Sequence, residues 1–430
     1  MYYDLAVIGA GWAGFNASIR AKELGLRVAL IEKNHIGGTC LNRGCIPTKS
    51  LIQSAKIYSL IKKSKNFGIE TQASSLDFDA IQSRKERIVE QLRQGMNFTL
   101  KGIDVINASA QLTGNDTITA DGKEIKAKSI LLACGSKPME LPNIKFNHTK
   151  IISSDDILNV NTLPSTLLII GGGVIGCEFA SLFCALGVKV AVVEKMPQLL
   201  PGEDREVARK LEMSFKKKGI SISTNTDAAT LDFSPYDLVL LSVGRVPDMT
   251  GLELDKTGVA LEKNRIKVDE YLRTSAPHIY AAGDCTGKIM LAHFAAYQGV
   301  VAAENIAHPD NLQKADNANI PNCIFTDPEI ASVGIDEEEA RQQGIDAEIH
   351  KFDFLGSGMA RILDETEGFI KIISDKQTGR IIGASIIAAK ATELIASLTV
   401  AVSNSLTAAQ IRNTVFAHPT LSEAIGEAFK

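Results

Sequence analysis

The feature that most constrains this chain is a glycine-rich pattern that occurs twice, 162 positions apart. In each copy an apolar strand leads into G-x-G-x-x-G, a helical pattern follows, and a second apolar strand ends at a glutamate. The glycines are Gly9, Gly11 and Gly14 in the first copy and Gly171, Gly173 and Gly176 in the second, and the glutamates are Glu32 and Glu194. One such pattern alone is weak, but the flanking strands, the helix and the spacing to the acid are typical of a dinucleotide-binding unit. We therefore predict an α/β protein with two Rossmann-like domains.

The two glutamates indicate what each site would recognise. Glycines let a diphosphate approach the backbone at a helix N-terminus, and an acid at the end of the second strand accepts hydrogen bonds from a ribose. Glu194 favours NAD over NADP, because a carboxylate suits a free 2′-hydroxyl and repels a 2′-phosphate. Lys195 follows it and leaves NADP open as the alternative.

A second feature is the close cysteine pair Cys40 and Cys45. The apolar spacing that follows predicts a helix starting near Pro47, with Cys40 in an irregular lead-in and Cys45 at the helix N-terminus. Five residues of continuous helix rise about 7.5 Å, beyond the roughly 4.4–6.8 Å Cα separation of a disulfide, so a disulfide would require the backbone to turn at Gly44. The spacing alone leaves three alternatives: a redox disulfide, half of a zinc site with His35, or two small buried hydrophobic residues.

Composition narrows the classes of protein. The 430 residues predict two or three domains. The net charge of −4 gives no reason to expect nucleic acid or an anionic membrane as partner. No apolar run of about 18 residues predicts a membrane-spanning helix, and the N-terminus shows no leader pattern. Seven cysteines in 430 residues, five of them scattered, do not form a secreted disulfide framework, so we expect a cytoplasmic protein, in which a close pair is more often catalytic. The other five are expected to be small buried hydrophobic residues: Cys134, Cys177, Cys184, Cys285 and Cys323.

The pattern of apolar and polar residues in the rest of the sequence predicts further helices and strands. Residues 51–98 have a helical pattern, and residues 102–136 read as short strands. From about 315 strands alternate and helices follow, which predicts a separate α+β domain. Near the C-terminus, Pro419 suits the first position of a helix, so we expect His418 at the N-cap and Glu423 inside the helix. A histidine oriented by a carboxylate can act as a base, although a surface histidine in a capped helix is the alternative.

With these features together, the chain resembles the pyridine nucleotide–disulfide oxidoreductases over nearly its whole length. The most specific segments are 37–50, 280–284, 290–293, 325–334 and 417–423. Within this family the chain looks most like the enzymes that oxidise dihydrolipoamide. The resemblance implies an FAD-binding domain at 1–145 that continues as a central domain at 246–312, an NAD-binding domain at 146–245, and a C-terminal α+β dimerisation domain at 313–430.

The resemblance also implies catalytic roles. Cys40 would exchange with the lipoyl dithiol and Cys45 would face the flavin. His418, oriented by Glu423, would be the acid/base and would reach the cysteines of the other subunit of a homodimer. Dihydrolipoamide would be oxidised to lipoamide, and its electrons would pass through the disulfide and FAD to NAD. Because no lipoyl-bearing segment precedes Met1, we expect the lipoyl group to come from a separate carrier protein in a 2-oxoacid dehydrogenase or glycine cleavage system.

The cofactor residues carry over position by position. Those expected to hold FAD are Gly9, Gly11, Gly14, Glu32, Thr39, Lys49, Gly135, Asp284, Met290, Leu291, Ala292 and His293. Those expected to hold NAD are Gly171, Gly173, Gly176, Glu194 and Gly244, and Glu178 would be the partner of Lys49. No metal is expected.

Two observations bear on the resemblance. The chain between Glu194 and Gly244 is shorter than the family pattern leads us to expect, as though strands of the NAD domain were trimmed. Sister reductases remain rivals, but a glutathione-type enzyme would favour basic residues after the second strand. A mercuric-type enzyme would need a C-terminal cysteine pair, and no cysteine follows Cys323.

Overall fold

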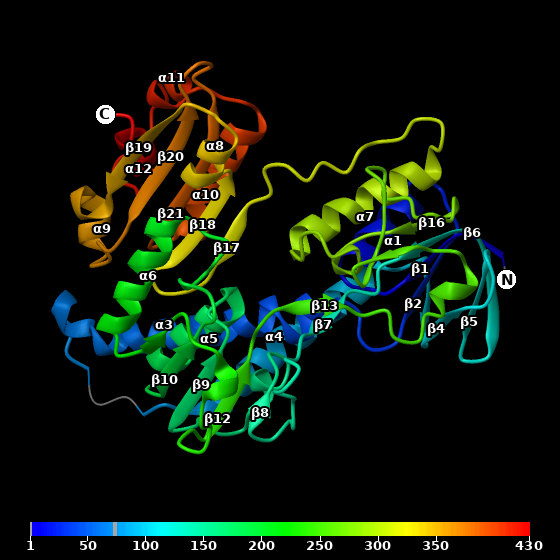
Figure 1. The fold of residues 1–430 in the computed structure, drawn as a ribbon, viewed down its shortest axis with the longest axis horizontal. Helices are drawn as coiled ribbons and strands as arrows, with labels where there is room; N and C mark the ends of the chain where they lie inside the picture. The colour runs from blue at the N-terminus through cyan, green and yellow to red at the C-terminus, as the bar shows by residue number, and fades with distance from the viewer. Residues whose placement is uncertain (1, 72–74) are drawn as a thin grey trace. The chain divides into compact units, whose positions relative to one another are not determined.

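The computed structural model describes residues 2–71 and 75–430, which form two compact units (Figure 1). Unit 1 comprises Met1–Leu51, Asp79–Met139 and Gly244–Asp316, and unit 2 comprises Ile52–Phe78, Glu140–Val243 and Asn317–Lys430. The units are described separately. Residues 72–74, within the helical pattern predicted over 51–98, lie outside the described residues.

Unit 1 is built on a seven-stranded sheet in the order β3-β2-β1-β6-β5-β4, with β16 also paired to β6. Its strands are β1 (Tyr2–Ile8), β2 (Val28–Glu32), β3 (Asp104–Asn107), β4 (Ala110–Leu112), β5 (Thr117–Ala120), β6 (Lys123–Leu132) and β16 (Ile279–Ala281). β1 is parallel to both β2 and β6, whereas β4, β5 and β6 form an antiparallel meander. The helices that matter here are α1 (Trp12–Glu23), α2 (Gly38–Arg43), α3 (Cys45–Lys62, continuing into unit 2), α4 (Phe78–Thr99) and α7 (Ala292–Ala307).

The central strand of this sheet shows why the sequence forms it. Leu5 and Val7 of β1 belong to one core, with residues of α1 and α7, and Ala6 and Ile8 belong to a second core on the other face. A parallel sheet covered on both faces needs a continuous apolar strand rather than an alternating one. The run at residues 5–8 has this character.

Unit 2 contains the second copy of the repeat. Its parallel sheet has the order β11-β10-β9-β12-β8, from β8 (Ile151–Ile152), β9 (Thr166–Ile170), β10 (Lys189–Val193), β11 (Ser221–Ser223) and β12 (Leu238–Leu241), with helices α5 (Val174–Ala185) and α6 (Arg205–Lys217). The order β11-β10-β9-β12 repeats β3-β2-β1-β6 of unit 1. Where the first copy has the β4–β5 hairpin, the described chain between β11 and β12 contains only the short turn η3 (Ala228–Thr230). The predicted shortening of this domain therefore corresponds to missing strands.

Unit 2 also contains the C-terminal α+β region. Its antiparallel sheet has the order β17-β18-β21-β20-β19, from β17 (Asn322–Ile324), β18 (Glu329–Gly334), β19 (Ala347–Asp353), β20 (Phe369–Asp375) and β21 (Ile381–Ala388). The helices are α8 (Glu337–Gln342), α9 (Gly358–Ile362), α10 (Ala391–Ser403), α11 (Ala408–Arg412) and α12 (Glu423–Glu427). The α/β class and the C-terminal α+β region are confirmed. The sequence analysis does not predict β18, because its three buried residues, Ile330, Ala331 and Val333, do not alternate strictly with polar ones.

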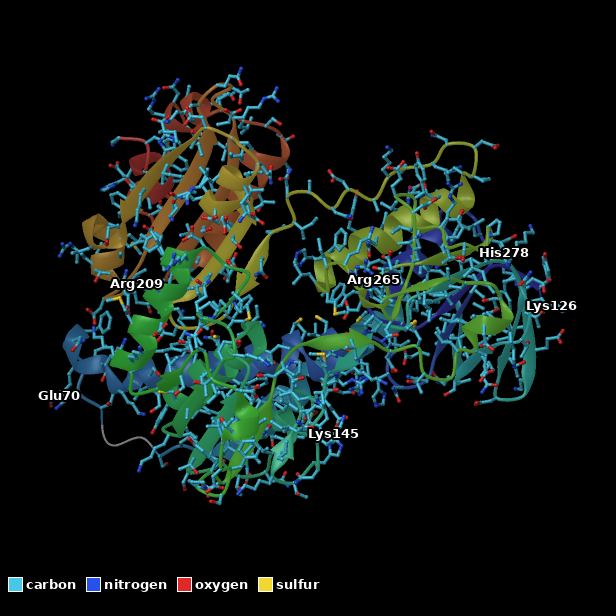
Figure 2. All side chains as sticks on the ribbon, viewed as in Figure 1. Glu70, Lys126, Lys145, Arg209, Arg265 and His278 are labelled. Carbon is cyan, nitrogen blue, oxygen red and sulfur yellow. The ribbon has the colours of Figure 1, made fainter. Side chains whose placement is uncertain are left out.

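Charged side chains lie on the outside of both units (Figure 2). The ammonium of Lys126 on β6 lies 3.4 Å from a carboxylate oxygen of Glu124, and that of Lys145 lies 3.3 Å from Glu140. Such exposed pairs stabilise a fold by only about 0–1 kcal/mol each. Among the described residues, no helix combines the length and the apolar character needed to cross a membrane.

Candidate active site

Cys40 and Cys45 lie on two consecutive helices. Cys40 is on α2, and Cys45 is the first residue of α3. The predicted position of Cys45 at a helix N-terminus is confirmed, but the irregular lead-in for Cys40 is wrong. α3 also begins two residues before Pro47. Proline is tolerated there because it lacks only an N–H, which the first turn of a helix leaves without an intrahelical partner.

Gly44 separates the two helices, with φ −146° and ψ −114°. A Cβ at this position would lie 2.9 Å from the carbonyl oxygen of Thr39 and 3.2 Å from the Cα of Cys40. Any larger residue would push the end of α3 away from α2. Gly44 therefore allows the two cysteines to approach each other, as the sequence predicts.

The two cysteines are thiols that are partly buried and hydrogen bonded to each other. The pKa of Cys40 is raised, first by this hydrogen bond, then by burial and by charge on Cys45, while Trp12 and the cation of Lys49 act in the opposite direction. Lys49 is on α3, one turn after Cys45, as predicted.

The acids at the ends of β2 and β10 hold the glycine-rich loops in the same way. Glu32 accepts a hydrogen bond from the Ala10 N–H at 2.7 Å and another from the Asn34 N–H at 2.8 Å. Glu194 accepts from the N–H groups of Gly172 and Met196, both at 2.7 Å. Each carboxylate oxygen has a second lone pair that can accept from a ribose hydroxyl.

The glycines of both loops fit a dinucleotide. A Cβ on Gly14 would lie 1.9 Å from the Gly9 carbonyl oxygen, so the third glycine is required for the helix to pack on its strand. The second glycine is different. A Cβ on Gly173 would meet nothing within 4 Å, and one on Gly11 would meet only the Cα of Gly38 at 3.9 Å. The backbone at the N-terminus of α1 and of α5 therefore faces open space, where a diphosphate can bind the N–H groups.

Asp284 is held in place by two residues that the sequence analysis does not predict. It lies in the turn η5 (Asp284–Thr286) and accepts a hydrogen bond of 2.5 Å from the Ser136 hydroxyl. Arg245 donates to the hydroxyl oxygen and to the carbonyl oxygen of Ser136, both at 2.8 Å. β7 (Ser136–Pro138) and β13 (Arg245–Pro247) pair with each other and bring these side chains together.

The other predicted cofactor residues fall at element ends. Gly135 directly precedes β7, and Met290 to His293 span the beginning of α7, with Leu291 at its N-cap. Gly244 precedes β13, and its carbonyl oxygen accepts the Met139 N–H at 3.0 Å. Gly244 is thus part of unit 1, whereas the other predicted NAD residues are in unit 2.

His418 and Glu423 contact each other directly in unit 2. His418 Nδ1 lies 2.8 Å from Glu423 Oε1, and Glu423 Oε2 accepts the Thr420 N–H at 2.9 Å. The Thr420 N–H and then the His418 contact hold the pKa of Glu423 below its usual range. The prediction that His418 is an N-cap is wrong, because α12 begins only at Glu423 and its N-cap is Ser422. The histidine side chain is 80% exposed, so its other nitrogen is accessible.

The predicted pairing of Lys49 with Glu178 joins residues of different units and stays a prediction. Glu178 is on α5, is 4% exposed, and accepts the Phe325 N–H at 2.9 Å. Buried polar groups are normally hydrogen bonded, and this contact satisfies one oxygen of the Glu178 carboxylate.

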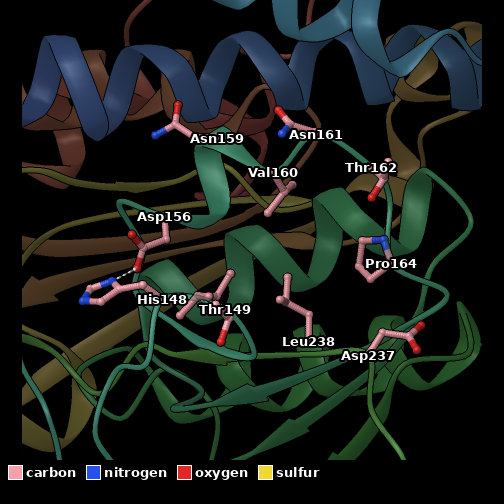
Figure 3. Close-up of a pocket in the computed structure, with 11 residues that line it drawn as sticks. His148, Thr149, Asp156, Asn159, Val160, Asn161, Thr162, Pro164, Asp237 and Leu238 are labelled. Carbon is pink, nitrogen blue, oxygen red and sulfur yellow. Dashed lines mark hydrogen bonds and ion pairs between the residues drawn. The ribbon is translucent and has the colours of Figure 1, made fainter.

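Unit 2 also has a cavity of about 540 Å³ between the ends of β8 and β12 (Figure 3). His148, Asp156 and Asp237 are among its lining residues, and His148 Nδ1 lies 2.9 Å from Asp156 Oδ2. None of the predicted site residues lines it. The cavity is therefore separate from the candidate active site.

The fold and the site define a class of protein with two dinucleotide-binding units and a close pair of cysteines. Residues 3–299 match the pyridine nucleotide-disulphide oxidoreductase family, and residues 320–429 match its dimerisation domain. The chain belongs to the pyridine nucleotide-disulphide oxidoreductases. Members of this family use FAD and NAD, which the two glycine loops fit.

Curated relatives place the chain more narrowly. It is 41% identical to a dihydrolipoyl dehydrogenase from Chlamydia pneumoniae, over 99% of this chain and 96% of the relative. It is 39% identical to one from Bacillus subtilis, over 99% and 97%. Within its family, the chain is an enzyme of the dihydrolipoyl dehydrogenase group.

Solved structures with folds similar to that of this chain include LpdA and RclA. LpdA from Mycobacterium tuberculosis has a TM-score of 0.91 at 29% identity, covering 99% of this chain and 98% of that one. RclA from Escherichia coli, described as an HOCl-induced flavoprotein disulfide reductase, has a TM-score of 0.89 at 30% identity and covers 99% of both chains. The dimerisation-domain match supports a homodimer.

Proposed function

We propose that this enzyme oxidises protein-bound dihydrolipoamide to lipoamide and reduces NAD to NADH, using a Cys40–Cys45 disulfide. The observation that carries the proposal is the contact between the two thiols across Gly44. Two sulfurs in contact on successive helices can alternate between dithiol and disulfide with little backbone movement. The lipoyl group of the substrate undergoes the same two-electron change.

The cysteines take different roles in the exchange. A lipoyl thiolate attacks the sulfur of Cys40, the Cys40–Cys45 bond breaks, and Cys45 leaves as a thiolate. The second lipoyl thiol then attacks the first lipoyl sulfur, which is bonded to Cys40. This step closes the lipoamide ring and releases Cys40.

His418 is the proposed acid/base for this exchange. Its Nδ1 is bound to Glu423, so Nε2 is the nitrogen that can take the proton of a lipoyl thiol. We propose that His418 acts on the cysteines of the other subunit of a homodimer.

In unit 1 the proposed residues would hold and orient FAD, and in unit 2 Gly171, Gly173, Gly176 and Glu194 would hold NAD. FAD would supply a two-electron acceptor next to Cys45, and NAD would be the final hydride acceptor. Glu32 and Asp284 would bind hydroxyl groups of FAD, and Glu194 would bind the ribose of NAD. The domain boundaries expected from the sequence belong to this proposal.

A direct assay tests the reaction. Purified enzyme is given dihydrolipoamide with NAD, and separately glutathione disulfide with NADPH. We expect NADH to form in the first assay and little turnover in the second; no activity in the first would refute the proposal. Cys45→Ser should abolish NADH formation while the yellow flavin stays bound, and Cys184→Ser, which changes a cysteine on α5 that is not part of the pair, should behave like wild type.

The likeness to RclA favours one other function, an NADH-dependent reductase of small disulfides. Both reactions need the cysteine pair, so the distinction lies in the substrate. The enzyme should oxidise dihydrolipoamide far faster than NADH reduces any small disulfide. The reverse order would favour the second function.

The carrier protein is part of the same proposal. We propose that the enzyme is the shared subunit of a cytoplasmic 2-oxoacid dehydrogenase or glycine cleavage system. Immobilised enzyme should retain a lipoylated protein from extract of its native cell. Peptide mass spectrometry would identify the carrier and hence the complex.

A further inference from the structure

Unit 1 contains a second pair of cysteines in contact, Cys134 and Cys285. Cys134 follows β6, and Cys285 lies in η5 after β16. β16 is parallel to β6, with Ala281 opposite Leu132, so the two strands end side by side. Both cysteines pack in one apolar core of the unit. The sequence analysis treats them as separate small hydrophobic residues.

The hydrogen bonds show how the two sulfurs face each other. The Cys285 thiol donates to backbone carbonyl oxygens, with Leu132 at 3.4 Å and Ala282 at 3.3 Å. The sulfur of Cys285 thus lies beside the end of β6, two residues before Cys134, and the side chains of Cys134 and Cys285 interact. Two residues along from Cys134, Ser136 bonds the neighbour of Cys285, Asp284, at 2.5 Å. Two independent side-chain contacts thus hold the same two segments together.

We propose that Cys134 and Cys285 form a second dithiol–disulfide pair, which a hydroperoxide oxidises. The two members differ in access. Cys285 is fully buried, whereas Cys134 is only partly buried, so the oxidant reaches Cys134 first. Neither residue has a role in the proposed lipoamide reaction.

The oxidation balances in two steps. The Cys134 thiolate attacks one oxygen of hydrogen peroxide, the O–O bond breaks, and hydroxide leaves and becomes water; Cys134 is now a sulfenic acid. The Cys285 sulfur then attacks the Cys134 sulfur, the S–O bond breaks, and the leaving hydroxide takes the Cys285 proton. Two thiols lose two electrons, and one peroxide becomes two waters.

The disulfide would tie the end of β6 to η5. Ser136 and Asp284 would then be held together by a covalent link as well as by their hydrogen bond. The hydrogen bond with Cys285 and loss of solvent raise the pKa of Cys134, so the thiolate is scarce at neutral pH. The pair should therefore stay reduced in ordinary use, and its oxidation should become faster as the pH rises.

The experiment uses intact holoenzyme treated with hydrogen peroxide. Free thiols are alkylated, the chain is digested without reduction, and peptides are analysed by mass spectrometry. We expect a peptide containing Cys134 linked to one containing Cys285, within a monomer band on a non-reducing gel. Thiol titration in denaturant should show a loss of two thiols per chain beyond the Cys40–Cys45 pair.

Matched variants separate this pair from the other cysteines. Cys134→Ala and Cys285→Ala should each abolish the extra loss, and Cys184→Ala should lose the same two thiols as wild type. The Cys40→Ala/Cys45→Ala double variant should still form the 134–285 link, so a failed lipoamide reaction would not affect the result. The proposal would be overturned if Cys134 and Cys285 were still free, and therefore alkylated, after Cys40 and Cys45 had been completely oxidised. Linkage of Cys134 to any other cysteine or to a second chain would also overturn it.

Discussion

Nδ1 of His418 lies 2.8 Å from Oε1 of Glu423, so one nitrogen of the imidazole is fixed by a carboxylate while the ring itself stays exposed. This arrangement suits a proton acceptor, because the second imidazole nitrogen is accessible to a group on another molecule. It is also the part of the proposed site most open to direct test.

Replacing His418 by glutamine should remove the proton acceptor and keep a similar volume. We expect kcat for dihydrolipoamide oxidation to fall by roughly 10²–10⁴-fold, the usual contribution of a general base. Glu423→Gln should cost less, because His418 keeps its proton-accepting nitrogen and loses only the charged hydrogen bond that orients the ring. Steady-state kinetics measures both. Equal and small effects would remove the pair from the mechanism.

Glu423 should contribute stability that depends on pH. Its pKa in the folded protein is lowered by the Thr420 N–H and by His418. A lowered pKa adds stability above the unfolded value of about 4.3, and that stability is lost as the pH falls through the folded pKa. Wild type should therefore lose more stability than Glu423→Gln between about pH 5 and pH 3. Urea midpoints at several pH values test this, and parallel curves would contradict it.

Gly44→Ala should disturb the cysteine pair. The added methyl group would lie 2.9 Å from the Thr39 carbonyl oxygen, so α2 and α3 must separate. We expect a loss of about 1–3 kcal/mol in the free energy of unfolding, typical of overpacking, and slower thiol exchange. Gly95→Ala is the matched control, because a Cβ there meets nothing within 4 Å. It should stabilise α4 by about 0.5–1 kcal/mol and leave the rate unchanged.

Glu194 should determine the choice between NAD and NADP. We expect kcat/KM for NAD to exceed that for NADP by about 10²-fold or more, because a 2′-phosphate would face a carboxylate. Glu194→Gln should lower the ratio of kcat/KM for NAD to kcat/KM for NADP by roughly tenfold. Lys195→Met is the control: its side chain is 78% exposed and paired with Asp227 at 3.2 Å, so its removal should not improve the use of NADP. An unchanged ratio in Glu194→Gln would refute this role.

Lys371 should be important for the stability of unit 2. It lies 2.9 Å from Asp204, and the two side chains are 3% and 4% exposed. Burial alone would lower the pKa of Lys371, but Asp204 and Glu206 raise it, so the residue stays charged. Lys371→Met would remove the cation from the buried carboxylate of Asp204, which would keep only its hydrogen bonds from the N–H groups of Glu206 and Val207, and we expect a loss of about 3–5 kcal/mol in the free energy of unfolding. Lys376→Met is the control: it removes an exposed ion pair with Asp346, so it should change the free energy of unfolding far less than Lys371→Met does.

Local chemistry explains which elements the sequence predicts correctly. The strand–glycine–helix–strand–acid unit is local, and each of its residues acts on neighbours within about 25 positions. The hydrogen bonds of Glu32 and Glu194 therefore follow directly from the repeat. The first residue of α3 does not follow as directly. Proline is common at the first position of a helix, but it is also tolerated later in the first turn, so Pro47 does not fix the start of α3 at Cys45.

Contacts between distant segments explain most of what the sequence does not predict. Ser136 and Arg245 look like ordinary polar residues until β7 pairs with β13. β18 lacks strict alternation, because its neighbours in the sheet decide which of its side chains are buried.

The sequence by itself determined the two nucleotide-binding units, the cysteine pair with its glycine turn, and the His418–Glu423 pair, because each depends on residues close together along the chain. Only the tertiary structure decided that Cys134 meets Cys285, that Arg245 and Ser136 hold Asp284, and that Lys371 is buried against Asp204. Those contacts exist because parallel strands end at a shared edge and sheets bring remote segments into register. No local pattern of residues records them.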